Sequence, residues 1–127
     1  MMRLRSCDRS ERAHHIAATG SGEAAWPARL SRDGGAPKTL LDVGCGEGVL
    51  THKWAQRIEG TVVGIDLDDP ALHAEWEQRS CPNLEYRVMK AENLPFGDDE
   101  FEMASAIEVL EHVPDPEHTV AEMARVA

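Results

Sequence analysis

The sequence predicts an α/β fold: a parallel sheet of about four strands, doubly wound by helices that connect one strand to the next. Two observations favour this fold. From residue 39 onward, short apolar runs alternate with segments of helical spacing. The segment LLDVGCGEGVLT, residues 40–51, passes from an apolar run through a glycine-rich turn into a helical pattern. Right-handed crossovers between such units bring successive strands into one parallel sheet.

The elements follow one another at regular intervals. Four strands are expected where apolar residues run together: residues 39–43, 61–66, 84–89 and 102–107. The first helix is expected over residues 47–58, whose apolar residues share one face, with Gly60 just past its end. Each later helix begins with an aspartate as cap and a proline at the first helical position, at Asp69–Pro70 and Asp115–Pro116. The last helix is expected to run to residue 127.

Charge is unevenly distributed along the 127 residues, a length that suits one modest domain. Residues 1–38 carry seven Lys or Arg and four Asp or Glu, a net charge of +3. They contain several Gly and Pro residues without a hydrophobic period, so we interpret them as a basic leader with one short helix near residues 10–18. Residues 39–127 carry a net charge of −13 and form the regular domain. That acidity argues against binding to nucleic-acid phosphates.

The cysteines and apolar runs bear on the compartment. The sequence has three cysteines, Cys7, Cys45 and Cys81, which is an odd number without a CxxC pair. This pattern argues against a disulfide framework or a zinc site and favours a reducing compartment. No apolar run approaches the roughly 20 residues of a membrane span. The arginines near the N-terminus are not followed by the apolar stretch of a secretion signal. The sequence therefore predicts a cytoplasmic protein without a membrane segment.

The glycine turn after the first strand is the predicted ligand site, because Gly44, Gly46 and Gly48 let a ligand approach the backbone at the carboxyl end of the sheet. Asp66 ends the second strand, where a carboxylate can accept hydrogen bonds from both hydroxyls of a ribose. The alternative role for Asp66 is a helix cap, although Asp69 already supplies one. The glycine spacing is GxGxG and not the GxGxxG of a dinucleotide site, which disfavours an NAD-dependent oxidoreductase.

Three motifs occur in order: LLDVGCGEGVLT, VVGIDLD and AENLPFGDDEFEMASAIEVLEHVPDP. Together they resemble the class I S-adenosylmethionine-dependent methyltransferases, and most closely the subgroup of ubiquinone and menaquinone biosynthesis. The resemblance covers residues 39–127. It implies a Rossmann-like domain, S-adenosylmethionine as cofactor and methyl transfer to a small-molecule acceptor.

In that family the glycine turn contacts the amino-acid part of the cofactor, the acid after the second strand holds the ribose, and the loop after the third strand covers the adenine. The resemblance therefore implies these cofactor-binding residues: Asp42, Gly44, Cys45, Gly46, Asp66, Leu67, Ala91, Glu92 and Ile107. Lys90 departs from the pattern, because the family commonly has an aspartate there that accepts from the adenine amino group. A lysine cannot accept that hydrogen bond, so we expect weaker cofactor binding or a backbone contact from Ala91 instead.

An ExxEH pattern, formed by Glu108, Glu111 and His112, follows the fourth strand. A related arrangement holds a metal in methyltransferases that act on RNA 3′ ends, whereas EVLEHV is also common, without a metal, in the small-molecule subgroup. We favour the second interpretation and predict no metal site, because a firm site usually needs another well-placed ligand. Glu108 and His112 are the candidates for a general base or for orienting the acceptor. No protein nucleophile is required, because the sulfonium methyl is already activated.

Methyltransferases of this kind continue with a fifth strand and usually two more, so the resemblance implies an incomplete domain that lacks the C-terminal strands. Residues 102–107 would then form an exposed apolar edge strand, and such an edge invites pairing with another chain. We therefore expect self-association. The alternative to an active methyltransferase is a noncatalytic module that keeps the fold in order to bind the cofactor or a partner.

Overall fold

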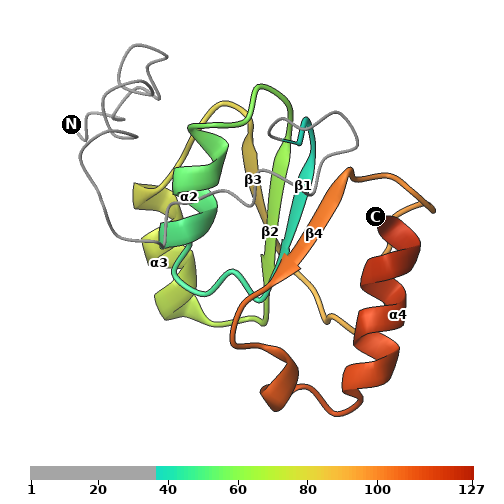
Figure 1. Cartoon of the computed structure of the whole chain (residues 1–127). Helices are drawn as coiled ribbons and strands as arrows, with labels where there is room; N and C mark the ends of the chain where they lie inside the picture. Colours follow the sequence, from blue (N-terminus) through green and yellow to red (C-terminus); the bar gives the residue numbers. More distant parts are fainter. Residues whose placement is uncertain (1–36) are drawn as a thin grey trace.

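The computed structural model describes residues 37–127, which form a four-stranded parallel sheet (Figure 1). The strands are β1 (Leu40–Val43), β2 (Val62–Asp66), β3 (Leu84–Val88) and β4 (Met103–Ala106), in the order β3-β2-β1-β4. The predicted α/β fold is therefore confirmed, and each predicted strand end lies within one residue of the observed end. The leader predicted for residues 1–38, with its helix at residues 10–18, lies outside the described residues except for its last two.

Three helices and one short 3-10 turn complete the described fold. They are α2 (Val49–Ala55), α3 (Pro70–Gln78), η2 (Leu110–His112) and α4 (Pro116–Val126). Figure 1 shows α2 and α3 on one side of the sheet and α4 on the other. The sheet is thus covered on both faces, which is why β1 and β2 are buried along nearly their whole length. The 3-10 turn after β4 was not predicted.

Side-chain alternation divides the core into two layers. Leu41 and Val43 point to the α4 side, where they pack with Val126, whereas Leu40 points to the α2 side and packs with Trp54. Each of these aliphatic side chains is 0 % exposed. Burial of one such side chain contributes about 1.5–3 kcal/mol. Because Asp42 alternates with Leu41 and Val43, its carboxylate points toward α2.

The starts of α3 and α4 confirm the predicted caps. The carboxylate of Asp69 accepts a 2.9 Å hydrogen bond from the Ala71 backbone N–H, and Asp115 accepts one of 3.1 Å from the N–H of His118. Proline occupies the first turn of both helices. Each cap satisfies a backbone donor that the helix itself leaves unpaired.

The predicted first helix, residues 47–58, is wrong at both ends, because α2 spans only Val49–Ala55. Gly48 caps the helix in the left-handed region, at φ 80°, which excludes residue 47 from the helix. Gly60 does not end the helix, since Gln56 is its C-cap. A glycine is required at position 60 because a Cβ there would collide with the backbone carbonyl of Lys38.

The two described cysteines differ. Cys45 is a free thiol, whereas Cys81 is buried and disulfide-bonded, so the argument against disulfides does not hold at Cys81. Within residues 37–127, none of the helices has the length and apolar character needed to cross a membrane.

Candidate functional site

The glycine turn joins β1 to α2 at the carboxyl edge of the sheet. Its three glycines adopt positive φ angles: 71° at Gly44, 56° at Gly46 and 80° at Gly48. Residues other than glycine rarely adopt this conformation, which explains the alternate spacing. The backbone N–H groups of Gly44 and Cys45 both donate to the carbonyl of Ile65, at 2.8 and 2.9 Å. The turn is thereby attached to the neighbouring strand β2.

Asp66, the last residue of β2, lies directly beside this turn. Its Oδ2 accepts a 2.7 Å hydrogen bond from the Gly46 N–H, and its Oδ1 accepts one of 2.7 Å from the Leu67 N–H. Asp69, and not Asp66, caps α3, so the alternative role as a helix cap is wrong. Each carboxylate oxygen has two lone pairs, so Asp66 can still accept hydrogen bonds from a ligand.

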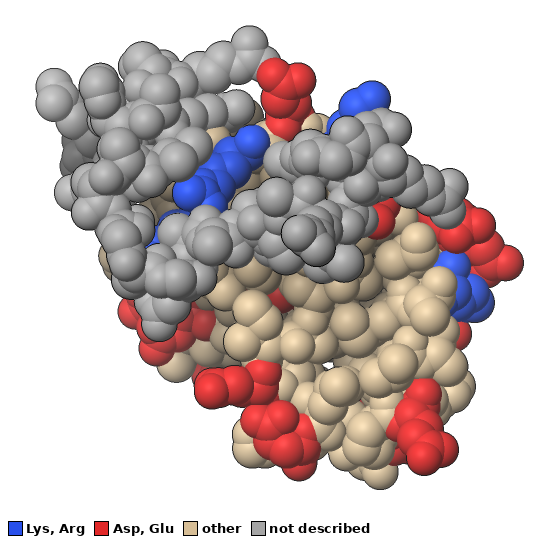
Figure 2. Space-filling model, viewed as in Figure 1, with Lys and Arg blue, Asp and Glu red and all other residues tan. Residues whose placement is uncertain are grey.

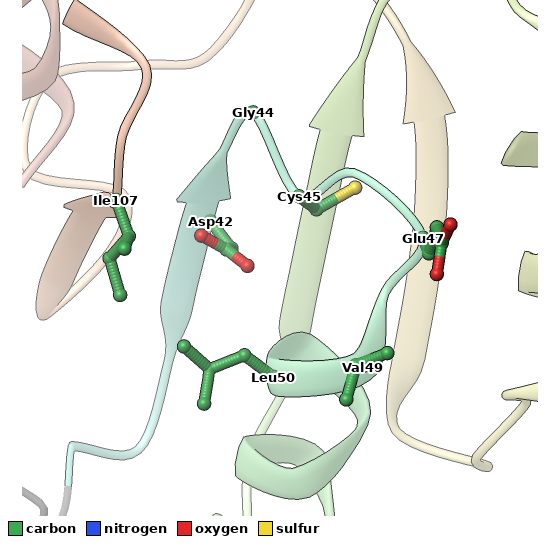
Figure 3. A pocket seen from close by; sticks show the side chains of 7 residues that line it. All are labelled: Asp42, Gly44, Cys45, Glu47, Val49, Leu50 and Ile107. Carbon is green, nitrogen blue, oxygen red and sulfur yellow. The ribbon is translucent and has the colours of Figure 1, made fainter. Parts of the chain in front are cut away.

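A pocket of about 330 Å³ opens between the glycine turn, the first turn of α2 and the end of β4 (Figure 3). Its lining residues are Asp42, Gly44, Cys45, Glu47, Val49, Leu50 and Ile107. Four of the predicted cofactor residues line it: Asp42, Gly44, Cys45 and Ile107. In Figure 3 Ile107 lies to the left of Asp42 and Leu50 below it, so two apolar side chains neighbour a carboxylate in the pocket.

Asp42 is only 5 % exposed, and hydroxyl groups from two other elements donate to it. Thr51 on α2 donates to Oδ2 at 2.6 Å, and Ser105 on β4 donates to Oδ1 at 3.0 Å. Burial raises the pKa of Asp42 to about 6, and the nearby charge of Asp66 raises it too, although the two hydroxyls act in the opposite direction. The carboxylate therefore changes its charge close to neutral pH.

The thiol of Cys45 also lines the pocket, but its chemistry is passive. Burial, with added repulsion from Asp42 and Asp66, raises its pKa far above the ordinary value. A thiol held protonated is neither a nucleophile nor a metal ligand. Cys45 therefore serves as a small residue that fills the tight turn.

The remaining predicted cofactor residues lie outside the pocket. Leu67 is 59 % exposed and follows Asp66, so a flat ligand can rest on it. Ala91 and Glu92 follow β3 and are half-buried, and Ala91 packs against the core on the α4 side. Lys90 is exposed.

The ExxEH residues follow β4: Glu108 lies on the connecting loop, and Glu111 and His112 lie in η2. Glu108 is exposed and adopts φ 54°, an uncommon conformation for a residue other than glycine. His112 Nε2 lies 3.7 Å from Oε1 of Glu111, and both side chains are more than half exposed. Across residues 37–127, His, Cys, Asp and Glu form no group of three or more that could hold a metal ion.

Sequence reasoning missed several residues that shape the site. Val49 and Leu50 were expected on the apolar face of a helix, and nothing local showed that they also line a pocket. Trp76 on α3 was not singled out from the sequence, yet its indole N–H donates a 2.7 Å hydrogen bond to the Gly46 carbonyl. Nothing in the sequence near Thr51 and Ser105 indicated that their hydroxyls bind Asp42, because these hydrogen bonds form only when α2 and β4 flank β1.

Comparison with known proteins agrees with this architecture. A curated ubiquinone biosynthesis O-methyltransferase of Pseudomonas fluorescens is 44 % identical over 92 residues, which are 70 % of this chain and 39 % of that protein. The crystal structure of a SAM-dependent methyltransferase from Methanosarcina mazei is 32 % identical with a TM-score of 0.59, and the match covers 72 % of this chain and 48 % of that one. A Bacillus subtilis protein, YcgJ, is 26 % identical with a TM-score of 0.64, over 72 % of this chain and 40 % of that one.

The chain thus spans about two fifths of the length of the curated relative. The family model described as a methyltransferase domain matches residues 41–127, which include the whole pocket and all of the sheet except Leu40. The chain belongs to the methyltransferase domain family.

Proposed function

We propose that this chain is the cofactor-binding part of an S-adenosylmethionine-dependent methyltransferase. One observation carries the proposal: the Asp66 carboxylate and the glycine turn are joined by the 2.7 Å hydrogen bond from the Gly46 N–H. That contact puts an acceptor for a sugar diol next to a backbone that a ligand can approach closely. The Methanosarcina mazei structure is named for its dependence on this cofactor, which supports the proposal.

The residues present fit such a cofactor. Asp66 would hold the two ribose hydroxyls, and Leu67 would contact the adenine. The amino-acid part would enter the pocket beside Gly44, where Asp42 and Glu47 carry the negative charge that a sulfonium or ammonium cation requires. Ala91 and Glu92 would lie near the adenine, with Lys90 unable to accept from its amino group.

The cofactor supplies an activated methyl group, which an acceptor lone pair attacks as the carbon–sulfur bond breaks. The chain's own contribution is to orient and to exclude water. Ile107 and Leu50 would shield the reacting centre from water. Glu108, exposed next to Ile107, and His112 are the candidates for taking the acceptor's proton.

We propose a small molecule with a hydroxyl group as the acceptor, because the curated relative is named an O-methyltransferase. Charge also supports a small molecule over a nucleic acid. Residues 39–127 carry a net charge of −13, and in Figure 2 acidic side chains occupy the lower margin of the visible face around an uncharged middle. Nucleic-acid phosphates would be repelled by such a surface.

Calorimetric titration with S-adenosylmethionine and with its demethylated thioether tests cofactor binding. We expect both to bind, and NAD not to bind. A chain that bound NAD and neither methyl donor nor thioether would overturn the proposal. Transfer of labelled methyl from S-adenosylmethionine to hydroxylated small molecules then separates an active enzyme from a noncatalytic binding module.

We further propose that the chain self-associates through β4, which lies at one end of the described sheet with its outer N–H and C=O groups unpaired by the described strands. The Met103 N–H points toward Thr39 on the β1 side, so by alternation the Ala104 N–H points outward. Sedimentation should show a dimer, and Ala104→Pro should shift it to monomer. A monomeric wild-type chain at high concentration would contradict this.

For the compartment, we propose the cytoplasm, because the apolar pattern of the sequence offers no membrane span. Fractionation of cells that make the protein would test this, with recovery in the soluble cytoplasmic fraction as the expected result.

A further inference from the structure

Gly46 is held on both sides of its α-carbon by side chains of the segment that contains β2 and α3. Its N–H donates to Oδ2 of Asp66, and its carbonyl accepts from Nε1 of Trp76, each at 2.7 Å. A Cβ added at Gly46 would meet nothing within 4 Å. These two hydrogen bonds orient the two peptide groups that flank Gly46, together with the 3.0 Å hydrogen bond from the Gly48 N–H to the Cys45 carbonyl and the 3.9 Å contact of the Cys45 thiol with the Gly46 carbonyl.

Trp76 is itself firmly placed. It is 8 % exposed, and its ring stacks on that of Tyr86, with centroids 5.1 Å apart and an interplanar angle of 4°. The ring of His73 also lies against that of Trp76, with centroids 5.0 Å apart and an interplanar angle of 33°. The hydroxyl of Tyr86 donates to the Arg79 carbonyl at 2.9 Å, which fixes the stacking partner in turn. The indole N–H is thus held toward the Gly46 carbonyl.

The same aromatic stack supports the end of the turn. A Cβ at Gly48 would lie 2.6 Å from the hydroxyl oxygen of Tyr86, so the backbone of the turn lies directly against that ring. The turn is enclosed by Tyr86 at one residue and hydrogen-bonded by Trp76 at another.

A glycine peptide rotates easily when nothing holds it, because glycine populates both signs of φ. If the peptide after Gly46 lost the Trp76 bond, the Gly46 carbonyl would keep only its 3.9 Å contact with the Cys45 thiol, and the resulting shift of Gly46 would weaken the hydrogen bond from its N–H to Asp66. The Oδ2 of Asp66 would then be less well held, and the Leu67 N–H would remain as the donor to Oδ1.

We propose that Trp76 is a positioning residue for Asp66: its indole N–H locks the Gly46 peptide and so aims the Asp66 carboxylate at the sugar diol. The inference rests on the proposed function, because it assumes that Asp66 binds a nucleoside. Trp76 touches no reacting atom and acts only through Gly46.

The first test compares two tryptophans of equal burial. Trp76→Phe keeps an aromatic ring for the stack and removes the N–H donor, and Trp54→Phe is its control, since Trp54 is also 8 % exposed but packs in the core on the α2 side. The probe is the demethylated thioether of S-adenosylmethionine, measured by calorimetry. We expect Trp76→Phe to raise the Kd about tenfold and Trp54→Phe to change it less than threefold. Equal effects would overturn the proposal.

A double-mutant cycle distinguishes an effect of Trp76 that acts through Asp66 from a merely structural role. If Trp76 acts through Asp66, then Trp76→Phe in an Asp66→Ala background should raise the Kd less than threefold further, because the orientation it protects no longer matters. A full additional tenfold loss would overturn the proposal. Failure of the wild-type chain to bind the thioether would instead refute the proposed function itself.

A spectroscopic test uses the wild-type residue. The chain has three tryptophans, so Trp26→Phe with Trp54→Phe leaves Trp76 as the single reporter. Binding of the thioether should shift its emission, since its N–H is bonded to the turn that receives the ligand. An unchanged spectrum at saturation would overturn the proposal even if Trp76→Phe failed to fold.

Discussion

The hydroxyl of Ser105 donates a 3.0 Å hydrogen bond to Oδ1 of Asp42, and it thereby joins two neighbouring strands across 63 positions of the sequence. Ser105 pairs with Asp42 in the parallel register of β4 and β1. Thr51 holds the other carboxylate oxygen from α2. Asp42 thus connects β1, α2 and β4, and it also lines the pocket. Its ionisation should therefore affect both the stability of the protein and the binding of a ligand.

Asp42 should make the stability of the protein depend on pH. Its pKa rises from 3.8 to about 6 on folding, so the folded state binds this proton more tightly than the unfolded state. Stability from Asp42 is therefore fully present below pH 4 and is lost as the pH rises through about 6. The loss is on the order of 3 kcal/mol.

Urea unfolding of the wild type and of Asp42→Asn between pH 4 and pH 7 measures this effect. The free energy of unfolding of Asp42→Asn relative to the wild type should rise by that amount across the interval. Parallel curves for the two proteins would mean that Asp42 has an ordinary pKa.

Thr51→Val should destabilise the protein at pH 7 by about 1–3 kcal/mol, because it leaves a buried carboxylate oxygen without its donor. Thr51 is 0 % exposed and donates at 2.6 Å. Thr51→Ser keeps the hydroxyl and loses one methyl group, for which about 0.8 kcal/mol is expected. Chemical denaturation of both variants checks the order; a serine variant as unstable as the valine variant would assign the effect to packing.

Asp66→Ala should weaken binding of S-adenosylmethionine at least tenfold, or about 1.4 kcal/mol, because the acceptor for the ribose hydroxyls is removed. Asp68→Ala is the matched control: it removes the same charge two residues later, from a side chain that is 79 % exposed. Calorimetry on the two variants separates a local contact from a general charge effect. Similar dissociation constants for both would argue against the assigned role of Asp66.

Alanine at Gly44 should affect mainly the stability of the protein, whereas alanine at Gly46 should affect mainly cofactor binding. At Gly44 a Cβ would collide with the side chain of Val109, so Gly44→Ala should lower the free energy of unfolding by more than about 2 kcal/mol. At Gly46 a Cβ meets nothing, so the cost in stability is about 1–2 kcal/mol for the left-handed backbone alone. That Cβ would, however, project into the open side of the turn and weaken cofactor binding. Thermal unfolding should show the larger loss of stability for Gly44→Ala, and calorimetry should show that Gly46→Ala weakens cofactor binding by more than its small loss of stability would suggest.

Local signals predicted most of the fold because they depend on near neighbours. Apolar runs located β1 and β2, and the Asp-Pro pairs located the starts of α3 and α4. The first helix was predicted too long because Gly48 was counted as part of a helical pattern, although its φ of 80° ends that pattern. Nothing in the residues near Glu108 indicated its φ of 54° or the 3-10 turn that follows.

The sequence by itself determined the alternation of strands and helices, the turn that needs glycine at alternate positions, and the acid at the tip of the second strand. Only the tertiary structure decided which of these groups meet: Trp76 with Gly46 across 30 positions, Gly46 with Asp66 across 20, and Ser105 with Asp42 across 63. The physical reason is the separation along the chain over which each effect acts. Backbone preference and hydrophobic period act over a few residues, whereas a hydrogen bond between distant side chains exists only after the sheet has set the register that brings its two ends within 3 Å of each other.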